Sequence, residues 1–373
     1  MIAHADVVII GGGPVGATLA LSLRETELSV VILEAQREAQ SDKRTLALSY
    51  NSRLILERLG VWQKLARFTP IENVHVSQRG AFGSVQLRAE EIELPALGYT
   101  LDYSELRRAL ASAIAESPIE VVRGAEVVSR ESISHYAAAR FRFNDLEHVM
   151  TANLLAIADG GASETKHDYL ERAIVTEVRT ESAPATTAFE RFRANGTIAL
   201  LPKPDRWALI WSAPFKTVER LLAASDEDFL REFELYFGER LGRFDEVGPR
   251  NSFPLIARVS PAIVGPRMVW LGNAAQTLHP VMAQGLNLGL RDAFALALET
   301  AATQKENIGS ERMLANYRAR RARDRRAAML ITDSLARLFA LDASRFATTV
   351  GFNALNSFSF ARKFFVRRAI FGS

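Results

Sequence analysis

The chain has 373 residues, 48% of them hydrophobic and 24% charged, and a formal net charge of +3. This balance excludes a disordered or fibrous chain and predicts a soluble globular protein of two domains. Because the chain has no cysteine, disulfides, thiolate metal sites and cysteine nucleophiles are excluded, and we expect a cytoplasmic protein. We expect neither a signal peptide nor a membrane-spanning helix, since no apolar run reaches about 20 residues.

The first 34 residues predict a strand, a helix and a second strand. Residues 7–10 are Val-Val-Ile-Ile, an all-apolar run of the kind found in the centre of a parallel sheet. Residues 14–24 carry apolar side chains at helical spacing, and residues 29–34 form a second apolar run. We therefore predict a βαβ unit at the start of the chain.

A glycine-rich segment lies between the first strand and the helix. Residues 11–16 read Gly-Gly-Gly-Pro-Val-Gly and match the G-x-G-x-x-G pattern of dinucleotide-binding turns, in which a helix N-terminus receives the pyrophosphate. The second strand ends in a carboxylate, which suits the ribose hydroxyls of an adenosine. The pattern predicts an adenine-dinucleotide site without deciding between NAD and FAD. The expected contacts are Gly11, Gly13, Pro14, Val15, Gly16 and Glu34.

The remaining elements alternate between helices and short strands. Helices are predicted at 51–65, 103–116, 226–237 and 286–300, with basic helices at the end of the chain. Strands are predicted within 74–94, where the apolar period is two, at 119–122, 154–158 and 268–271, and through most of 172–260. The predicted fold class is α/β. A Rossmann-like dinucleotide-binding domain (1–72, 100–170 and 262–310) is interleaved with a mainly antiparallel β-sheet substrate domain (73–99 and 171–261), and residues 311–373 form a basic helical region.

Two later segments distinguish between the two cofactors. The first, Ala-Asp-Gly-Gly-Ala-Ser at 158–163, follows an apolar strand. The second runs from a strand through Gly272 and Asn273 to a helix that starts near residue 285. The free amides of Gly285, Leu286 and Asn287 at that helix start could hold a negative charge on a flavin ring, and Asn273 could bond to ribityl hydroxyls. These features favour FAD.

On these three segments the chain resembles the group A flavoprotein monooxygenases, the para-hydroxybenzoate hydroxylase superfamily. It is most similar to the ubiquinone-biosynthesis hydroxylases of the 2-octaprenyl-6-methoxyphenol hydroxylase type, through residues 272–289 and through Phe-Glu-Arg-Phe at 189–192. The chain departs from the family pattern at three positions. Asn273 replaces the usual aspartate, Ala283 replaces a glycine, and Tyr103 stands where many relatives have glutamine or arginine.

The resemblance implies a set of cofactor contacts. FAD would be the cofactor, and NADPH or NADH would be a transient electron donor. Asp159 and Gly160 would touch both FAD and the donor, and Arg44 would contact FAD. Pro280 would lie near the reactive edge of the isoalloxazine. His279 could act as a base beside the flavin, or it could be a plain turn residue.

The implied reaction is hydroxylation of the aromatic ring of a polyprenylated phenol by O2, through a flavin C4a-hydroperoxide, in ubiquinone biosynthesis. Two alternatives remain open. The first is a hydroxylase of the same superfamily that acts on another substrate, and the second is a flavin-binding, non-catalytic member of a biosynthetic complex. No metal site is expected, because the six histidines show no ligand spacing.

The end of the chain is basic and rich in phenylalanine, with Arg362, Lys363, Arg367 and Arg368 among five phenylalanines between 358 and 371. This composition suits a peripheral contact with the inner face of a membrane or with a biosynthetic complex. It suits equally a segment whose phenylalanines pack onto the body of the protein. Nucleic-acid binding is not expected, since no known motif accompanies the basic residues. A homo-oligomer remains open.

Overall fold

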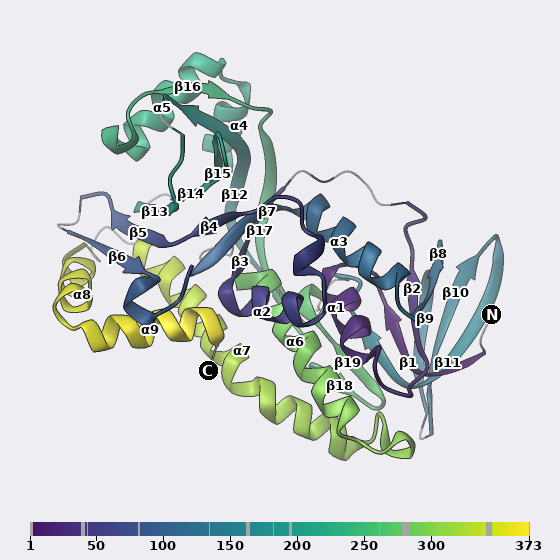
Figure 1. Ribbon diagram of the computed structural model, residues 1–373. Helices are drawn as coiled ribbons and strands as arrows, with labels where there is room; N and C mark the ends of the chain where they lie inside the picture. The colour runs from purple at the N-terminus through teal and green to yellow at the C-terminus, as the bar shows by residue number, and fades with distance from the viewer. Residues whose placement is uncertain are drawn as a thin grey trace.

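The computed structural model describes residues 3–38, 42, 44–80, 83–133, 135–161, 165–181, 183–193, 196–260, 262–277, 284–340 and 345–372. Within these ranges the chain forms three sheets with helices packed on their faces (Figure 1). This arrangement confirms the predicted α/β class. The division of the chain into domains stays a prediction.

The first sheet is parallel at its centre. Strand β1 (His4–Ile10) lies between β2 (Val30–Glu34) and β11 (Leu146–Ile157) and runs parallel to both. Val7 packs on the helical side of the sheet and Val8 packs on the opposite side, so both faces of β1 are buried. The other strands are β8 (Glu120–Arg123), β9 (Glu126–Ser132), β10 (Ala137–Phe143), β18 (Val264–Gly265) and β19 (Met268–Trp270).

Several helices pack on the helical side of this sheet. Among them, α1 (Pro14–Leu23) and α6 (Gln284–Ala301) lie against each other. Strand β1, helix α1 and strand β2 form the predicted βαβ unit, so the prediction for the first 34 residues is confirmed.

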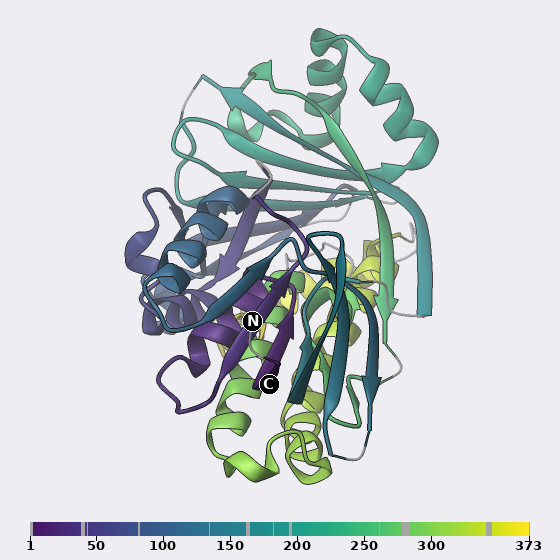
Figure 2. The same ribbon diagram turned by 90° about the vertical axis from the view of Figure 1, so that its right-hand side faces the viewer.

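The second sheet is larger and mainly antiparallel, and it lies above the first in Figure 2. Its order is β20-β17-β12-β15-β14-β13-β5-β6, with β16 beside β12. Helices α4 (Phe215–Ala223) and α5 (Asp226–Phe237) cover one face around the buried ring of Trp211. The strands are β5 (Asn73–Gln78), β6 (Ser84–Arg88), β12 (Thr165–Thr180), β13 (Thr187–Arg193), β14 (Gly196–Pro202), β15 (Trp207–Pro214), β16 (Phe244–Val247), β17 (Asn251–Val259) and β20 (Gln276–Thr277).

A small third sheet lies between the other two. It has the order β3 (Thr45–Ser49), β7 (Gly98–Asp102), β4 (Thr69–Ile71), and helices α2 (Tyr50–Arg58) and α3 (Tyr103–Ala115) follow two of its strands. Lys203 connects this sheet to the large one, since its Nζ lies 2.8 Å from Asp102 Oδ1 and 2.5 Å from Glu177 Oε1. Short 3-10 turns lie at Trp62–Lys64, Glu90–Ile92, Glu239–Leu241, Gly272–Ala274 and Lys305–Asn307.

Three helices end the chain. Helix α7 (Glu311–Ala340) runs beside α6, and the helices α8 (Arg345–Ser357) and α9 (Ser359–Phe371) fold back against β6 and α2 (yellow in Figure 1). Val366 and Ile370 of α9 are buried in one cluster with Val85 and Leu87 of β6. No helix among the residues described is long and apolar enough to cross a membrane.

The predicted elements differ from the structure in several places, and strands β3, β4, β7, β9 and β10 were not predicted. The helix predicted at 51–65 ends at Arg58, because Gly60 adopts a φ of +72° that breaks the helix. Helix α4 replaces part of the β-structure predicted within 172–260. The helix predicted at 226–237 is confirmed at those bounds.

Candidate functional site

The glycine turn after β1 is shaped by close approaches of the backbone. Gly11 has a φ of +99°, and a Cβ there would lie 2.7 Å from the Ala158 carbonyl oxygen. A Cβ at Gly16 would overlap the Gly11 carbonyl oxygen, so these two glycines allow the chain to pack. A Cβ at Gly13 would meet nothing within 4 Å, and α1 begins directly after it. The first amides of α1 therefore adjoin open space in which a pyrophosphate could bind.

Glu34 is tied to this turn by its carboxylate. Oε2 accepts a hydrogen bond from the Gly12 amide at 2.6 Å, and Oε1 accepts one from the Gln36 amide at 2.8 Å. Because each carboxylate oxygen has two lone pairs, both oxygens can still accept a hydrogen bond from a hydroxyl. The predicted ribose carboxylate therefore lies beside the predicted pyrophosphate turn.

The Asp159-Gly160 segment lies against the same turn. It follows β11, whose neighbour is β1, and the Ala158 amide donates to the Ile10 carbonyl at 2.8 Å. Asp159 Oδ1 accepts from the Gly161 amide at 2.8 Å, and Gly160 has a φ of +73° with nothing within 4 Å of its Cβ position. The structure therefore brings the first and second motifs together.

The third segment packs against helix α1 at two of its glycines, Gly272 and Gly289. A Cβ at Gly289 would lie 2.8 Å from Val15 Cγ2 and 3.1 Å from Gly272 Cα. Val15 therefore packs into the space that these two glycines leave, and α6 can approach α1 closely. Asn273 lies in the turn after Gly272 and lines the cavity described below. All three motifs thus meet at the carboxyl ends of the parallel strands, a usual place for a ligand in such sheets.

Asn287 has a second role that the sequence did not indicate. Its Oδ1 accepts from the Ser49 amide at 2.8 Å and from Ser52 Oγ at 2.7 Å, and its Nδ2 donates to the Ala47 carbonyl at 3.0 Å. The side chain is buried and joins α6 to β3 and α2. Only the backbone amide of Asn287 is therefore a candidate for a cofactor contact.

Arg44 is held by a carboxylate close to the start of β3. Its Nε lies 2.9 Å from Asp42 Oδ2 and its Nη2 lies 2.6 Å from the same oxygen. The hydrogen bond from Arg44 is the largest cause of the lowered pKa of Asp42. The guanidinium also lies 5.2 Å from the ring of Tyr103, whose pKa is raised by burial. Arg44 lines the cavity, and its predicted contact with FAD stays a prediction.

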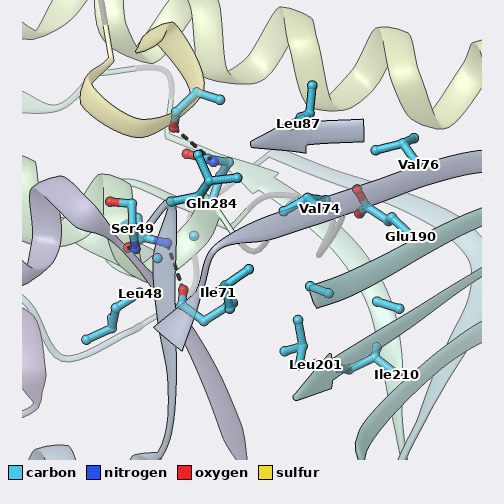
Figure 3. A pocket seen from close by; sticks show the side chains of 18 of the residues that line it. Leu48, Ser49, Ile71, Val74, Val76, Leu87, Glu190, Leu201, Ile210 and Gln284 are labelled. Atoms are coloured by element: carbon cyan, nitrogen blue, oxygen red, sulfur yellow. Dashed lines mark hydrogen bonds between the residues drawn. The ribbon is translucent and has the colours of Figure 1, made fainter. Parts of the chain in front are cut away.

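A cavity of about 720 Å³ begins at these segments (Figure 3). Its first end is lined by residues 44–49, Asn273, Thr277 and residues 285–287. From there it extends along the face of the large sheet that α4 and α5 do not cover. Its other end lies under α8 and α9. The walls there are Phe352, Leu355, Phe365, Val366, Ala369 and Ile370.

Two features of the site were missed by sequence reasoning. The C-terminal helices form a cavity wall, although the spacing of their phenylalanines was visible in the sequence. A buried ionic cluster also holds α6 to α7. Arg291 Nε lies 2.9 Å from Asp324 Oδ2, and Arg321 Nε lies 2.7 Å from Asp292 Oδ1. Gln276 joins this cluster through its hydrogen bonds to Asp292 and Arg325.

Some predicted site residues cannot be placed. His279, Pro280 and Ala283 lie outside the described residues, so their predicted roles stay predictions. Among the residues that are described, no group of three histidine, aspartate or glutamate side chains could hold a metal ion.

Comparisons with known proteins agree with this geometry. Residues 4–332 match the family model of the FAD binding domain. The ubiquinone hydroxylase UbiL of Rhodospirillum rubrum is 32% identical over 388 residues, covering 98% of this chain and 89% of that protein. The 3-demethoxyubiquinol 3-hydroxylase of Escherichia coli is 29% identical over 346 residues, covering 86% of each. The crystal structure of p-nitrophenol 4-monooxygenase PnpA from Pseudomonas putida shares the fold, with a TM-score of 0.79, 17% identity, and coverage of 98% of this chain and 97% of that one.

The described residues fit FAD. Gly13, Gly160 and Gly285 each come from a different motif, and each has open space where a Cβ would stand. Glu34 offers acceptors to a ribose, and the cavity adjoins the N-terminus of α6. The chain belongs to the FAD binding domain family and is an FAD-dependent aromatic monooxygenase of the para-hydroxybenzoate hydroxylase superfamily, in its ubiquinone-biosynthesis hydroxylase branch.

Proposed function

We propose that the protein hydroxylates the aromatic ring of a polyprenylated phenol in ubiquinone biosynthesis, using O2, FAD and electrons from NADPH or NADH. The observation that carries the proposal is the shape and lining of the cavity. It runs from the flavin segments to the C-terminal helices, and nearly all its side chains past the flavin end are aliphatic or aromatic. An apolar chain attached to a phenol ring suits such a space, since burying apolar surface contributes about 25 cal/mol per Å².

The cofactor contacts follow from the motifs. The amides after Gly13, with Pro14 and Val15 at the start of α1, would hold the pyrophosphate, and Glu34 would accept from the ribose. Arg44, Asp159, Gly160 and Asn273 would contact FAD at its middle. The amides of Gly285, Leu286 and Asn287 would lie at the pyrimidine edge of the flavin ring, with Pro280 and His279 beside the reacting substrate.

Bound FAD supplies the activation of O2 and the delivery of one oxygen atom to the ring. The protein's own residues orient the phenol and exclude water. The apolar walls formed by Val74, Leu201, Ile210 and Phe352 leave water few partners beside the reacting atoms. An electron-rich phenol needs no metal for this chemistry. The cavity residues would orient the phenol and exclude water from the reacting atoms.

The test uses the purified flavoprotein with short-chain prenylphenols. We expect NADPH or NADH to reduce the bound flavin faster when a prenylphenol is present, and mass spectrometry to find a product one oxygen atom heavier. Hydroxylation of soluble phenols but not of prenylphenols would favour the same-superfamily alternative. Flavin that is not reduced, with no oxygenated product from any phenol, would favour the non-catalytic alternative.

We also propose that helix α9 binds an anionic membrane surface, from which a prenylated substrate would come. Its inner face is packed on the protein, but Phe360 is 81% exposed and Phe364 is 57% exposed. Lys363 and Arg367 lie on the same helix and are exposed. Apolar rings beside cations suit the interface of an anionic bilayer.

Vesicle co-sedimentation tests the membrane proposal. The double variant Phe360→Ser with Phe364→Ser should lose binding to vesicles that contain phosphatidylglycerol. The matched control is Leu235→Ser, which changes a 68% exposed leucine on α5. Equal binding by the double variant and the control would contradict the proposal. So would equal binding to neutral and anionic vesicles.

A further inference from the structure

Two arginines of strand β13 lie on the face of the large sheet that α5 covers. Phe189 packs on the ring of Phe237 in α5, with the two centroids 5.8 Å apart. Because successive side chains of a strand point to opposite faces, Arg191 and Arg193 lie on this same face, while Glu190 lines the cavity on the other. The Phe-Glu-Arg-Phe segment of β13 therefore places its arginine outside the flavin cavity, in surroundings that the proposed function does not use.

Both arginines are partly buried, and the described residues provide neither with a paired carboxylate. Nε of Arg191 and Nη1 of Arg193 are covered by protein atoms and have no hydrogen-bond partner there. Burial lowers the pKa of both guanidiniums, because a charge that loses water without gaining a partner is destabilised. Arg193 lies over the ring of Tyr236, with Cζ 3.5 Å from its centroid. The carboxylate of Glu232 accepts hydrogen bonds from Arg220 instead, at 2.5 and 2.6 Å.

Two further arginines lie close to this pair, and both are exposed. Arg79 follows β5, the neighbour of β13, and its Nη1 donates to the Leu235 carbonyl in the last turn of α5 at 2.9 Å. Arg240 lies in the 3-10 turn after α5. After burial, these two positive charges are the causes that lower the pKa of Arg191. Gly238 ends α5 beside Arg191, since a Cβ on Gly238 would stand 3.9 Å from both Nη atoms of that side chain.

The four arginines put positive charge at one edge of the large sheet with little to balance it. The last carbonyls of α5 carry the partial negative charge of a helix C-terminus, and Arg79 already uses one of them. Each guanidinium presents paired N–H groups whose geometry matches phosphate oxygens. A phosphate dianion can accept hydrogen bonds from several guanidiniums at once, whereas a single carboxylate would balance only one charge. The arrangement therefore suits a phosphate better than an acidic side chain.

We propose that Arg79, Arg191 and Arg240 bind a phosphate group beside the C-terminus of α5. Arg193, held on Tyr236, adds its charge to the site. The ligand is a phosphate or phosphate monoester, which could come from solution or from the headgroup of a lipid such as phosphatidic acid. Because the arginines lie on the face of the sheet away from the cavity, this site is separate from the flavin site and does not depend on the proposed hydroxylation.

Phosphate binding by the intact flavoprotein tests the site. Chloride is replaced by inorganic phosphate at constant ionic strength, and binding is measured by isothermal titration calorimetry and by the midpoint of thermal unfolding. We expect saturable binding by the wild type, and binding that is weaker by about tenfold or more in Arg191→Gln and Arg240→Gln. The matched control is Arg142→Gln, which changes an exposed arginine of β10 paired with Glu126 and should bind as the wild type does. The control also removes the general stabilisation that phosphate gives to proteins.

Thermal unfolding without phosphate separates ligand binding from a structural role. Arg191→Gln should unfold at or above the wild-type temperature, because it removes a buried charge that Arg79 and Arg240 repel. A structural role for Arg191 would lower the midpoint instead and would contradict the proposal. Arg240 is exposed, so Arg240→Gln keeps the comparison open if Arg191→Gln fails to fold.

A vesicle experiment distinguishes the two sources of phosphate. Vesicles with phosphatidic acid are compared with vesicles of phosphatidylglycerol, whose phosphate is a diester. Binding of inorganic phosphate that depends on Arg191 and Arg240 supports the site with a soluble ligand. A preference for phosphatidic acid that depends on the same two arginines supports it with a lipid headgroup. If both variants match Arg142→Gln with inorganic phosphate and with vesicles, the site is overturned and the proposed hydroxylation is unaffected.

Discussion

Two alanine substitutions in the glycine turn should separate packing from cofactor binding. At Gly16 an added Cβ would overlap the Gly11 carbonyl oxygen and stand 3.1 Å from its carbon, inside the 3.4 Å of ordinary contact. Helix α1 would have to move away from the turn, and overpacking of this kind costs about 1–3 kcal/mol. We therefore expect Gly16→Ala to destabilise the protein even without FAD.

The second substitution, Gly13→Ala, should affect cofactor binding and not packing. The φ of −65° and ψ of −179° at Gly13 suit alanine, and an added Cβ would meet nothing within 4 Å. Loss of glycine at the helix N-cap is destabilising, and the stiffer unfolded chain is stabilising. The free energy of unfolding of the apoprotein should therefore change by less than about 1 kcal/mol. A methyl group there would stand where the pyrophosphate approaches, and we expect at least 100-fold weaker FAD binding, about 2.8 kcal/mol.

The assay pairs urea unfolding of the two apoproteins with titration of FAD by fluorescence quenching. Gly13→Ala should unfold at the same urea concentration as the wild type and bind FAD weakly, whereas Gly16→Ala should unfold at a lower urea concentration. Wild-type FAD affinity in Gly13→Ala would refute the placement of the pyrophosphate. Wild-type stability in Gly16→Ala would refute the close approach of α1 to the turn.

Three further substitutions test the electrostatics of the fold. Burial, Arg240 and Arg191 lower the pKa of His75 from 6.5 to about 4, so the unfolded chain takes up the proton first. The free energy of unfolding should fall by up to about 3 kcal/mol from pH 6.5 to pH 4, and His75→Gln should flatten this slope in urea titrations across that range. Asp324→Asn should destabilise by about 3–5 kcal/mol in urea unfolding, because the buried Arg291 then loses its paired carboxylate and Arg321 keeps only Asp292; wild-type stability would contradict this. Lys203→Met should cost about 1–3 kcal/mol by the same measurement, since it removes the link between two sheets, and an unchanged midpoint would argue against that link.

Local patterns in the sequence determined the first βαβ unit and the nature of the cofactor. A run of four apolar residues predicts a strand buried on both faces, and β1 is buried on both. The three motifs carry their own backbone requirements, so they could be read without knowing their neighbours. The sequence alone left open whether the basic C-terminal segment contacts a membrane or packs onto the protein. In the structure one side of α9 is packed on the protein, while Phe358, Phe360 and Phe364 stay exposed.

The tertiary structure decided what each residue faces. Periodicity shows which side of an element is buried, but it does not show which distant segment covers that side. Gly16 and Gly13 look alike in the motif, yet one adjoins a carbonyl and the other adjoins open space. No sequence pattern singled out Glu190, and in the structure it lines the cavity. The backbone amide of Asn287 was predicted to contact the cofactor, and its side chain has a separate role that joins α6 to the small sheet. The contacts of Asn287 reach residues 238 and 240 positions away, and only the folded chain brings them together.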